Sequence, residues 1–212
     1  MLFEVHRSEI ELKKQEIQYE ELWNTLSELI ETIQVGTSKT SEIVKSLGIY
    51  ARQSEGQNEQ IDINQAIRTT VRLVQHMMPY QENLKLDLQP GLPAVMGNEG
   101  RISQVLLNII VNAIHAIEEE GIIEVKTELF ASERQVIVFV RDTGAGIPKE
   151  IQGRIFDPFF TTKEVGKGTG LGLSISRSII EEHKGQINFF TDDNGTLFQI
   201  SLPIGDNVRK AV

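Results

Sequence analysis

Two glycine clusters constrain the fold of this chain more than any other feature of its sequence. The first covers residues 142–148, Asp-Thr-Gly-Ala-Gly-Ile-Pro, and the second covers 166–173, Gly-Lys-Gly-Thr-Gly-Leu-Gly-Leu. Because glycine tolerates positive φ and close approach of the backbone, both clusters predict loops rather than the interior of a helix or strand. The second cluster leads into an apolar-periodic segment, and the amide groups at the start of such a helix form an anion site. A phosphate-binding loop is one interpretation, and a flexible loop without a ligand is the other.

The common phosphate-loop motifs are absent from both clusters. Lys167 is followed by Gly168, where a Walker-type loop has Ser or Thr. No predicted strand leads directly into the second cluster, which disfavours a dinucleotide-binding fingerprint.

The spacing of apolar residues predicts helices and strands that end in hairpins. We expect helices over residues 2–54, 63–78, 98–120 and 171–183, and strands over 83–89, 122–129, 135–141, 186–191 and 196–203. Short turns join the last strands in pairs, so the expected class is α+β. An N-terminal helical arm precedes an α/β sandwich with a mixed, largely antiparallel sheet and helices on one face. The polar stretch 55–60 separates the arm, residues 1–57, from the second domain, residues 58–212.

The N-terminal helix carries a heptad seam, which is typical of helices that pack along their length. Its apolar positions alternate in steps of four and three, although Gly36 and Thr40 weaken the centre. We therefore expect a homodimer through residues 2–54, with one amphipathic helix lying on its own domain as the alternative. The seam positions are Leu22, Leu26, Leu29, Ile33, Gly36, Thr40, Ile43, Leu47 and Tyr50.

Composition excludes several classes of function. The 212 residues include 21 Lys plus Arg and 30 Asp plus Glu, a formal net charge of −9, which argues against binding to a nucleic-acid backbone. The absence of cysteine excludes disulfides, thiolate zinc sites and a cysteine nucleophile. The longest apolar run, 105–117, is too short and too polar to span a bilayer, so we expect no membrane contact from this chain. A cytoplasmic location is expected, whether or not a parent protein is anchored in a membrane.

Two asparagines interrupt the apolar helix predicted over 98–120. Asn108 and Asn112 are four residues apart and therefore share one face of that helix. Asparagine is a poor helix former, and an amide oxygen can join a Mg²⁺ shell that also takes waters and phosphate oxygens. The alternative is that both amides bond to neighbouring backbone.

Four segments in order resemble the N, G1, F and G2 boxes of sensor histidine kinases. They are Asn112 in its apolar helix, Asp142-Thr-Gly-Ala-Gly, Phe156-Asp-Pro-Phe-Phe-Thr-Thr-Lys, and the second glycine cluster. The resemblance covers about residues 60–204. It implies the α/β sandwich shared with gyrase, mismatch-repair ATPases and related chaperones, with ATP and Mg²⁺ bound by the second domain.

The resemblance assigns roles at the phosphate end of the site. Asn112 resembles the Mg²⁺ ligand, and Asn108 a polar neighbour near the phosphates with a catalytic role. His115, Lys163 and Lys167 are candidates for phosphate contacts, with solvated side chains as the alternative. The lid edge that wraps the phosphates corresponds to Gly168, Thr169, Gly170, Leu171 and Gly172.

At the base end, Asp142 resembles the carboxylate that accepts a hydrogen bond from the adenine amino group. Guanine would place a carbonyl oxygen there, so a preference for ATP is expected. Gly144, Gly146 and Ile147 belong to the loop that approaches the base, and Thr196 stands where the last hairpin closes the pocket. The aromatic residues expected to anchor the lid are Phe156, Phe159 and Phe160.

One departure separates this chain from the hydrolytic branch of the superfamily. Gyrase-like ATPases carry a glutamate four residues before the Mg²⁺ asparagine, and Asn108 occupies that position here. An amide cannot take a proton as a carboxylate can, which favours phosphoryl transfer to histidine over hydrolysis. A slow gyrase-like ATPase remains a weaker alternative.

The acceptor motif of the family is missing from the helical arm. His6 is the one histidine there, and Arg7 replaces the acid that would follow an acceptor. We therefore expect the acceptor histidine upstream or on another chain, with His6 as the less favoured candidate and a response regulator receiver domain as partner. The alternative is an ATP-binding dimer without autokinase activity that acts by conformation or by docking the regulator.

Overall fold

The computed structural model describes residues 13, 21–30, 33, 59–77, 83–117, 121–163 and 168–205. The chain divides into two compact units. The first comprises residues 1–51 with 162–169, and the second comprises residues 52–161 with 170–212.

The N-terminal segment of the first unit is helical wherever it is described. Residues 21–30 form a helix, and residues 13 and 33 also have helical backbone. Four seam positions, Leu22, Leu26, Leu29 and Ile33, are between 45% and 62% exposed in the single chain. Such exposure is compatible with a seam that packs on a second helix, and the homodimer through residues 2–54 stays a prediction. The remaining seam positions and His6 lie outside the described residues.

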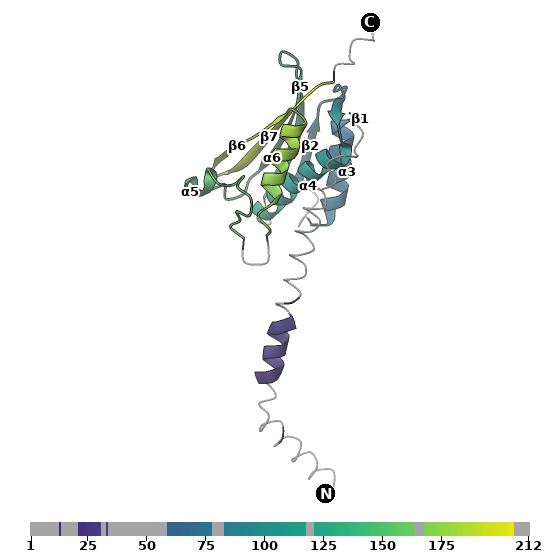
Figure 1. Ribbon diagram of the computed structural model, residues 1–212. Helices are drawn as coiled ribbons and strands as arrows, with labels where there is room; N and C mark the ends of the chain where they lie inside the picture. The colour runs from purple at the N-terminus through teal and green to yellow at the C-terminus, as the bar shows by residue number, and fades with distance from the viewer. Residues whose placement is uncertain are drawn as a thin grey trace. The chain divides into compact units, whose positions relative to one another are not determined.

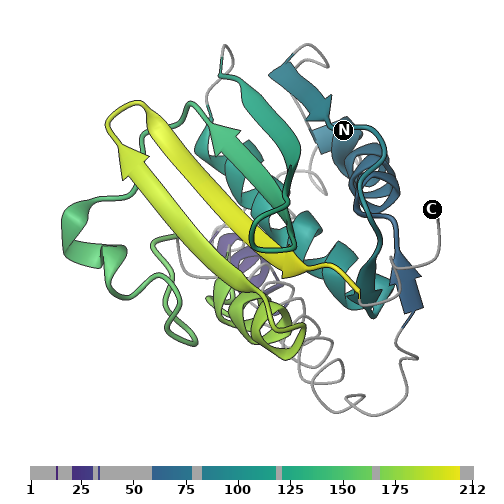
Figure 2. The same cartoon turned by 90° about the horizontal axis from the view of Figure 1, so that it is seen from above.

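A five-stranded sheet forms the second unit's framework, in the order β2-β4-β5-β7-β6 (Figures 1 and 2). Its strands are β2 (Leu84–Leu88), β4 (Ile123–Phe130), β5 (Gln135–Asp142), β6 (Gln186–Asp192) and β7 (Gly195–Pro203). β2 and β4 are parallel, and the other neighbouring pairs are antiparallel. The expected mixed, largely antiparallel sheet is therefore confirmed.

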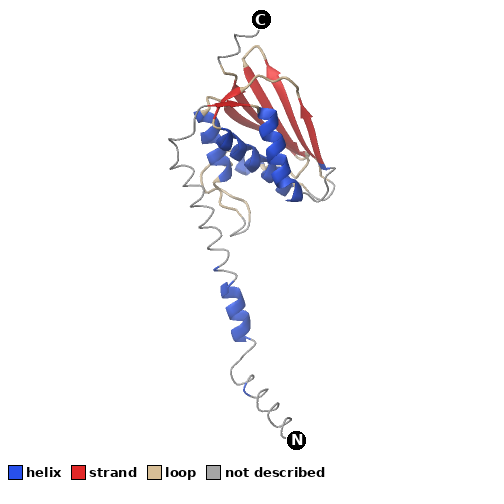
Figure 3. Ribbon diagram, turned by 90° about the vertical axis from the view of Figure 1, so that its right-hand side faces the viewer, coloured by secondary structure: helices blue, strands red, loops and turns tan. Residues whose placement is uncertain are grey.

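Three helices cover one face of this sheet, as Figure 3 shows. They are α3 (Ile63–Val74), α4 (Glu99–Ala116) and α6 (Gly172–Glu182). The side chains of Asp62 and Asn98 cap α3 and α4, each accepting a hydrogen bond from the amide three residues further on at 3.0 Å. These caps satisfy amide groups that the first helical turn leaves unpaired, so the starts of both helices follow from local sequence.

The core lies between the helices and the sheet. α3 and α4 bury residues at helical spacing, and the strands bury alternate positions, so apolar side chains from both layers meet. The bulkiest fully buried side chains are Ile61, Ile63, Ile67, Ile102, Leu106, Ile109, Ile110, Ile123, Ile179, Ile180, Ile200 and Leu202.

The structure differs from the sequence expectation in several places. α4 ends at Ala116 instead of about residue 120, because Ile117 already has an extended backbone (φ −89°, ψ 148°) that leads toward β4. On β2 the expected apolar face is only partly covered, and Leu86 is 38% exposed on this edge strand. A small antiparallel sheet of β1 (Glu59–Ile61) and β3 (Val95–Gly97), the 3₁₀ turn η1 (Gln75–Met77) and the short helix α5 (Lys149–Gln152) were not expected.

Candidate functional site

A polar row crosses three neighbouring strands at one end of the sheet. Asp142 pairs with Thr196 in the β5–β7 ladder, and Thr196 pairs with Thr191 in the β6–β7 ladder. Alternation along β5 places Asp142 on the same face as the buried Val136, Val138 and Val140, which is the face under the helices. At this end of the sheet the inward positions of the three strands are therefore polar, while their next inward positions belong to the core.

The Asp142 carboxylate is 3% exposed and held by backbone amides. The amides of Gly144, at 2.9 Å, and Thr196, at 3.2 Å, both donate to its Oδ1 atom. Within the described part of the chain Oδ2 is left to accept from a ligand. Burial raises the pKa of Asp142, and the two amide hydrogen bonds and the nearby Arg141 oppose that rise without cancelling it.

The loop after Asp142 is fixed against the protein on both sides. Gly146 has φ of +71°, and a Cβ atom there would collide with the carbonyl oxygen of Asp192. A Cβ atom at Gly144 would likewise collide with the carbonyl of Ala116, at the end of α4. The Ile147 amide donates to the Thr191 hydroxyl at 2.8 Å. Glycine is thus required here for packing of the loop itself, and the closeness of Gly144 and Gly146 to a base stays a prediction.

The two asparagines of α4 share a face, as predicted, but their surroundings differ. The Asn108 Nδ2 group donates to the hydroxyl of Ser176 on α6 at 3.0 Å. A Cβ atom at Gly172 would collide with the Asn108 carboxamide, so α6 approaches α4 closely at this point. Asn112 is half-buried, and its carboxamide has no hydrogen-bond partner in the described part of the chain. One helical turn therefore separates an engaged amide from one that can bind a ligand.

The first turn of α6 presents its backbone beside Asn108. Leu171 occupies the N-cap position, and no side chain caps the turn. The amide groups there lack intrahelical acceptors, and the helix dipole adds positive potential, so this end suits an anion. Gly170 (φ +66°) packs against the backbone of Phe159, which itself has φ of +66°.

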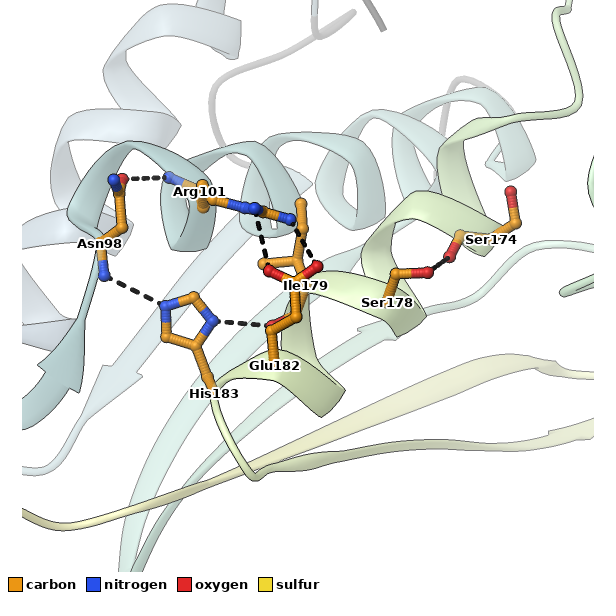
Figure 4. A network of polar contacts seen from close by, with 7 residues as sticks. All are labelled: Asn98, Arg101, Ser174, Ser178, Ile179, Glu182 and His183. Atoms are coloured by element: carbon orange, nitrogen blue, oxygen red, sulfur yellow. Dashed lines mark hydrogen bonds and ion pairs between the residues drawn. The ribbon is translucent and has the colours of Figure 1, made fainter. Parts of the chain in front are cut away.

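The opposite end of the α4–α6 pair is held by a polar network (Figure 4). The Asn98 amide donates to His183 Nε2 at 3.1 Å, and His183 Nδ1 lies 2.7 Å from the Ile179 carbonyl oxygen. The two terminal nitrogens of the Arg101 guanidinium, Nη1 and Nη2, bind the Glu182 carboxylate at 2.9 and 3.1 Å. Together with the Asn108–Ser176 bond near the middle of both helices, this network holds α6 on α4.

The aromatic residues of the 156–163 segment do not behave alike. Phe156 packs on the core, 3.8 Å below the Arg177 guanidinium and 6.1 Å from the Phe189 ring. Phe160 is also packed on the core, with Arg154 4.7 Å above its ring. Phe159 is 68% exposed, so the expectation that it anchors the lid is wrong for this conformation. Its backbone is left-handed, with φ of +66°, unlike the backbones of Phe156 and Phe160.

The structure gives less information on the other predicted site residues. His115 is exposed in the last turn of α4. Lys163, Gly168 and Thr169 belong to the first unit, so their membership of the site rests on the sequence pattern, as does that of Lys167, which lies outside the described residues.

Two features are absent from the described residues. Among the described residues no group of three or more His, Asp or Glu side chains could hold a metal ion. The half-buried amide oxygen of Asn112 fits a Mg²⁺ shell that phosphate and water oxygens would complete. No helix in the described part of the chain has the length and apolar character needed to cross a membrane.

Sequence reasoning missed Thr191 and Ser176. Thr191 could have been found, because the predicted turn at Asp193-Asn194 places Thr191 opposite Thr196. No local signal marked Ser176, since its partner Asn108 is 68 residues away.

Comparison with known proteins agrees with these observations. Residues 97–206 match the family model described as histidine kinase-, DNA gyrase B-, and HSP90-like ATPase. The chain is 33% identical to the signal transduction histidine-protein kinase AtoS of Escherichia coli over 81% of its own length, and 34% identical to the sensor kinase CckA of Brucella abortus over 82%. It spans 28% and 20% of the lengths of these two relatives.

Solved structures extend the likeness to three dimensions. The nucleotide-free catalytic domain of histidine kinase ThkA has a TM-score of 0.61 at 36% identity, covering 69% of this chain and 95% of that one. A complex of ThkA with the response regulator protein TrrA has a TM-score of 0.69 at 32% identity, covering 87% of this chain and 53% of that one. The resemblance drawn from the sequence is thereby confirmed. The chain belongs to the histidine kinase-, DNA gyrase B- and HSP90-like ATPase family, and within it to the ATPase domains of two-component sensor histidine kinases.

Proposed function

We propose that this chain is an ATP-dependent kinase core that binds ATP with Mg²⁺ along α4 and transfers the γ-phosphoryl group to a histidine. The observation that carries the proposal is the contrast on α4: Asn108 is engaged with α6, whereas the Asn112 amide one turn away is available to a ligand. This amide, the uncapped first turn of α6 and the buried Asp142 carboxylate form a site with a cation ligand, an anion site and a base acceptor.

At the base end, Asp142 selects the nucleotide. Its Oδ1 atom is occupied by two backbone amides, so the ionised Oδ2 atom accepts a hydrogen bond from the adenine amino group. A guanine would present a carbonyl oxygen to the same atom, and two acceptors repel each other. A buried carboxylate makes this discrimination strong, because unpaired polar groups are costly away from water.

At the phosphate end, the chain positions the phosphate groups of ATP and neutralises part of their charge. In this proposal the amides of the first turn of α6 bind phosphate oxygens, and Gly168, Thr169, His115, Lys163 and Lys167 are further candidates for phosphate contacts. Asn112 would hold Mg²⁺, which when bound neutralises charge on the transferred phosphoryl group. No general base is provided by Asn108, whose amide cannot accept a proton and is committed to Ser176. This supports transfer to a protein acceptor rather than hydrolysis.

The acceptor and partners complete the proposal. The residue directly after His6 is Arg7 and not an acid, so we propose that the acceptor histidine is supplied by a segment upstream or by another chain. Dimerisation through residues 2–54 would bring such a histidine to the site. A response regulator receiver domain is the proposed final recipient, a partner of the kind present in the ThkA–TrrA complex. The missing acceptor motif also supports a second candidate, an ATP-binding dimer that signals by conformation without labelling itself.

Incubation with γ-labelled ATP and Mg²⁺ tests the proposal. We expect no acid-labile label on the chain alone, and label on a co-incubated histidine-containing dimerisation segment of a related kinase. Label on the chain that His6→Ala removes would make His6 the acceptor. ATP binding without transfer to any histidine would favour the second candidate, and steady phosphate release would favour the ATPase alternative. Asn112→Ala is the control, because it should abolish every transfer.

A further inference from the structure

Thr191, near the end of β6, joins three parts of the base end of the site through one hydroxyl. The Ile147 amide donates to its Oγ1 at 2.8 Å, and Oγ1 donates to the Gly195 carbonyl oxygen at 3.1 Å. The Oγ1 atom of Thr196 lies 3.2 Å away. A hydroxyl has one donor and two acceptor positions, so these three contacts use its whole capacity.

Counting protons fixes the direction of the bond between the two threonines. The single Thr191 proton goes to the Gly195 carbonyl, which can only accept. The Thr196 hydroxyl therefore donates to Thr191, and its remaining lone pairs can only accept. The Thr196 amide meanwhile donates to Asp142 Oδ1. The base end consequently carries acceptors at two neighbouring positions, Asp142 Oδ2 and Thr196 Oγ1.

The same hydroxyl also positions the loop that follows Asp142. The Ile147 amide is its attachment point, and the neighbouring Gly146 lies against the Asp192 carbonyl, next to Thr191 in β6. Loss of the hydroxyl would free the Thr196 proton to turn and would release the loop from the hairpin. Both changes would weaken the distinction between a ligand donor and a ligand acceptor.

We propose that Thr191 is a positioning residue for nucleotide selectivity, which fixes the Thr196 hydroxyl as an acceptor and docks the 144–147 loop beside Asp142. The inference rests on the proposed ATP-binding function, and Thr191 acts through its neighbours without contact to the nucleotide. The group recognised is an exocyclic amino group on a purine, and the group rejected is a carbonyl at the same position.

Thr191→Val removes the hydroxyl and keeps the shape of the side chain, whereas Thr191→Ser keeps the hydroxyl. We would measure the affinity of the full chain for ATP and for GTP with Mg²⁺, and the hydrogen exchange of the Ile147 amide without nucleotide. Thr191→Val should lower the preference for ATP over GTP by about fivefold, the effect of one hydrogen bond, and should speed exchange at Ile147. Thr191→Ser should stay within about twofold of the unaltered chain for the same reason.

Thr127 on β4 supplies a matched control. Its hydroxyl is also buried, accepts from the Gln89 amide at 3.0 Å and donates to Asn64 Oδ1 at 2.8 Å. It lies four residues along β4 from Ile123, the partner of Asp142. Thr127→Val should lower stability and leave the ATP to GTP ratio unchanged.

The outcomes separate the two levels of the argument. Equal weakening of ATP and GTP in Thr191→Val would show a merely structural role and overturn the proposal. An unchanged ratio of ATP to GTP affinity with faster exchange at Ile147 would also overturn the role in selectivity. It would show that the Thr191 hydroxyl docks the loop without affecting the choice of nucleotide. If the unaltered chain bound neither nucleotide, the proposed ATP-binding function and the selectivity role of Thr191 would both fail. Exchange at the Ile147 amide would still show whether Thr191 holds the loop. Should Thr191→Val not fold, the smaller Thr191→Ala carries the same comparison.

Discussion

The Asn108 carboxamide on α4 donates to the Ser176 hydroxyl on α6 at 3.0 Å, and Ser176 is 1% exposed. This bond, together with the close approach of Gly172, places the first turn of α6 beside the helix face that carries Asn112. Two asparagines that look equivalent in the sequence therefore have different tasks. Asn108 joins two helices, whereas the half-buried Asn112 is the proposed ligand of Mg²⁺.

Substitution of the two asparagines by alanine should separate these tasks. Asn112→Ala should remove the Mg²⁺-dependent part of ATP affinity and leave the free energy of unfolding within about 0.5 kcal/mol, because its amide has no partner among the described residues. Asn108→Ala should lower the free energy of unfolding by about 1–3 kcal/mol, because it leaves the buried Ser176 hydroxyl unpaired. Urea unfolding and ATP titration with and without Mg²⁺ measure both quantities. Equal loss of stability in the two variants would contradict this division.

Asp142→Asn should invert the selectivity of the base end. The asparagine oxygen can still accept from the amides of Gly144 and Thr196, so its Nδ2 group takes the place of Oδ2 and faces the base. Two donors then oppose each other when adenine binds, whereas a guanine carbonyl can accept. We expect ATP affinity to fall by roughly 10- to 100-fold and GTP affinity to rise, measured by titration calorimetry. Asp193→Asn in the exposed hairpin turn is the charge-matched control and should change neither.

The fold of the second unit could be predicted from the sequence because its signals are local. Asp62 and Asn98 are N-cap residues that mark the starts of α3 and α4. The turn at Asp193-Asn194 sets the register between β6 and β7. Asp142 and Thr196 were assigned from the resemblance of their segments to known motifs, and the burial of both side chains agrees with a shared inward face. The nucleotide-binding role came from the order of four motifs rather than from any one of them.

Contacts between distant segments escaped prediction. His183 pairs with the Asn98 amide 85 residues earlier, and no periodicity links them. The carbonyl of Ala116, where α4 ends, lies against Gly144 in a distant loop, and the sequence of α4 does not contain that contact. Phe159 was misassigned because its left-handed backbone, at φ +66°, is not encoded by a glycine. Such features depend on tertiary packing, which overrides local preference.

As pH falls and Asp142 takes up a proton, the stability of the fold should rise and the affinity for ATP should fall. Burial, the dominant cause, raises its pKa in the folded chain above that of the unfolded chain. The folded state therefore takes up the proton first as pH falls, so stability relative to Asp142→Asn should rise as pH falls through the raised pKa and level off near pH ~4. ATP binding needs the ionised carboxylate, so affinity should fall over the same interval. Unfolding and ATP titrations at a series of pH values give both curves, and parallel trends would contradict the assignment.

His183 should prove to be a structural residue of the α4–α6 pair and not part of the nucleotide site. Its ring fills the space beside Gly97, where a Cβ atom would collide with it, and its Nε2 atom accepts from the Asn98 amide. His183→Ala should therefore lower the free energy of unfolding by about 1–3 kcal/mol, because it removes this packing and the acceptor of a partly buried amide. The nucleotide end of α6 lies about 16 Å away along the helix, at 1.5 Å per residue, so ATP affinity at full folding should stay within about twofold. Glu181→Ala, an exposed neighbour, is the control and should be nearly neutral. A loss of ATP affinity in His183→Ala without loss of stability would place His183 in the site instead.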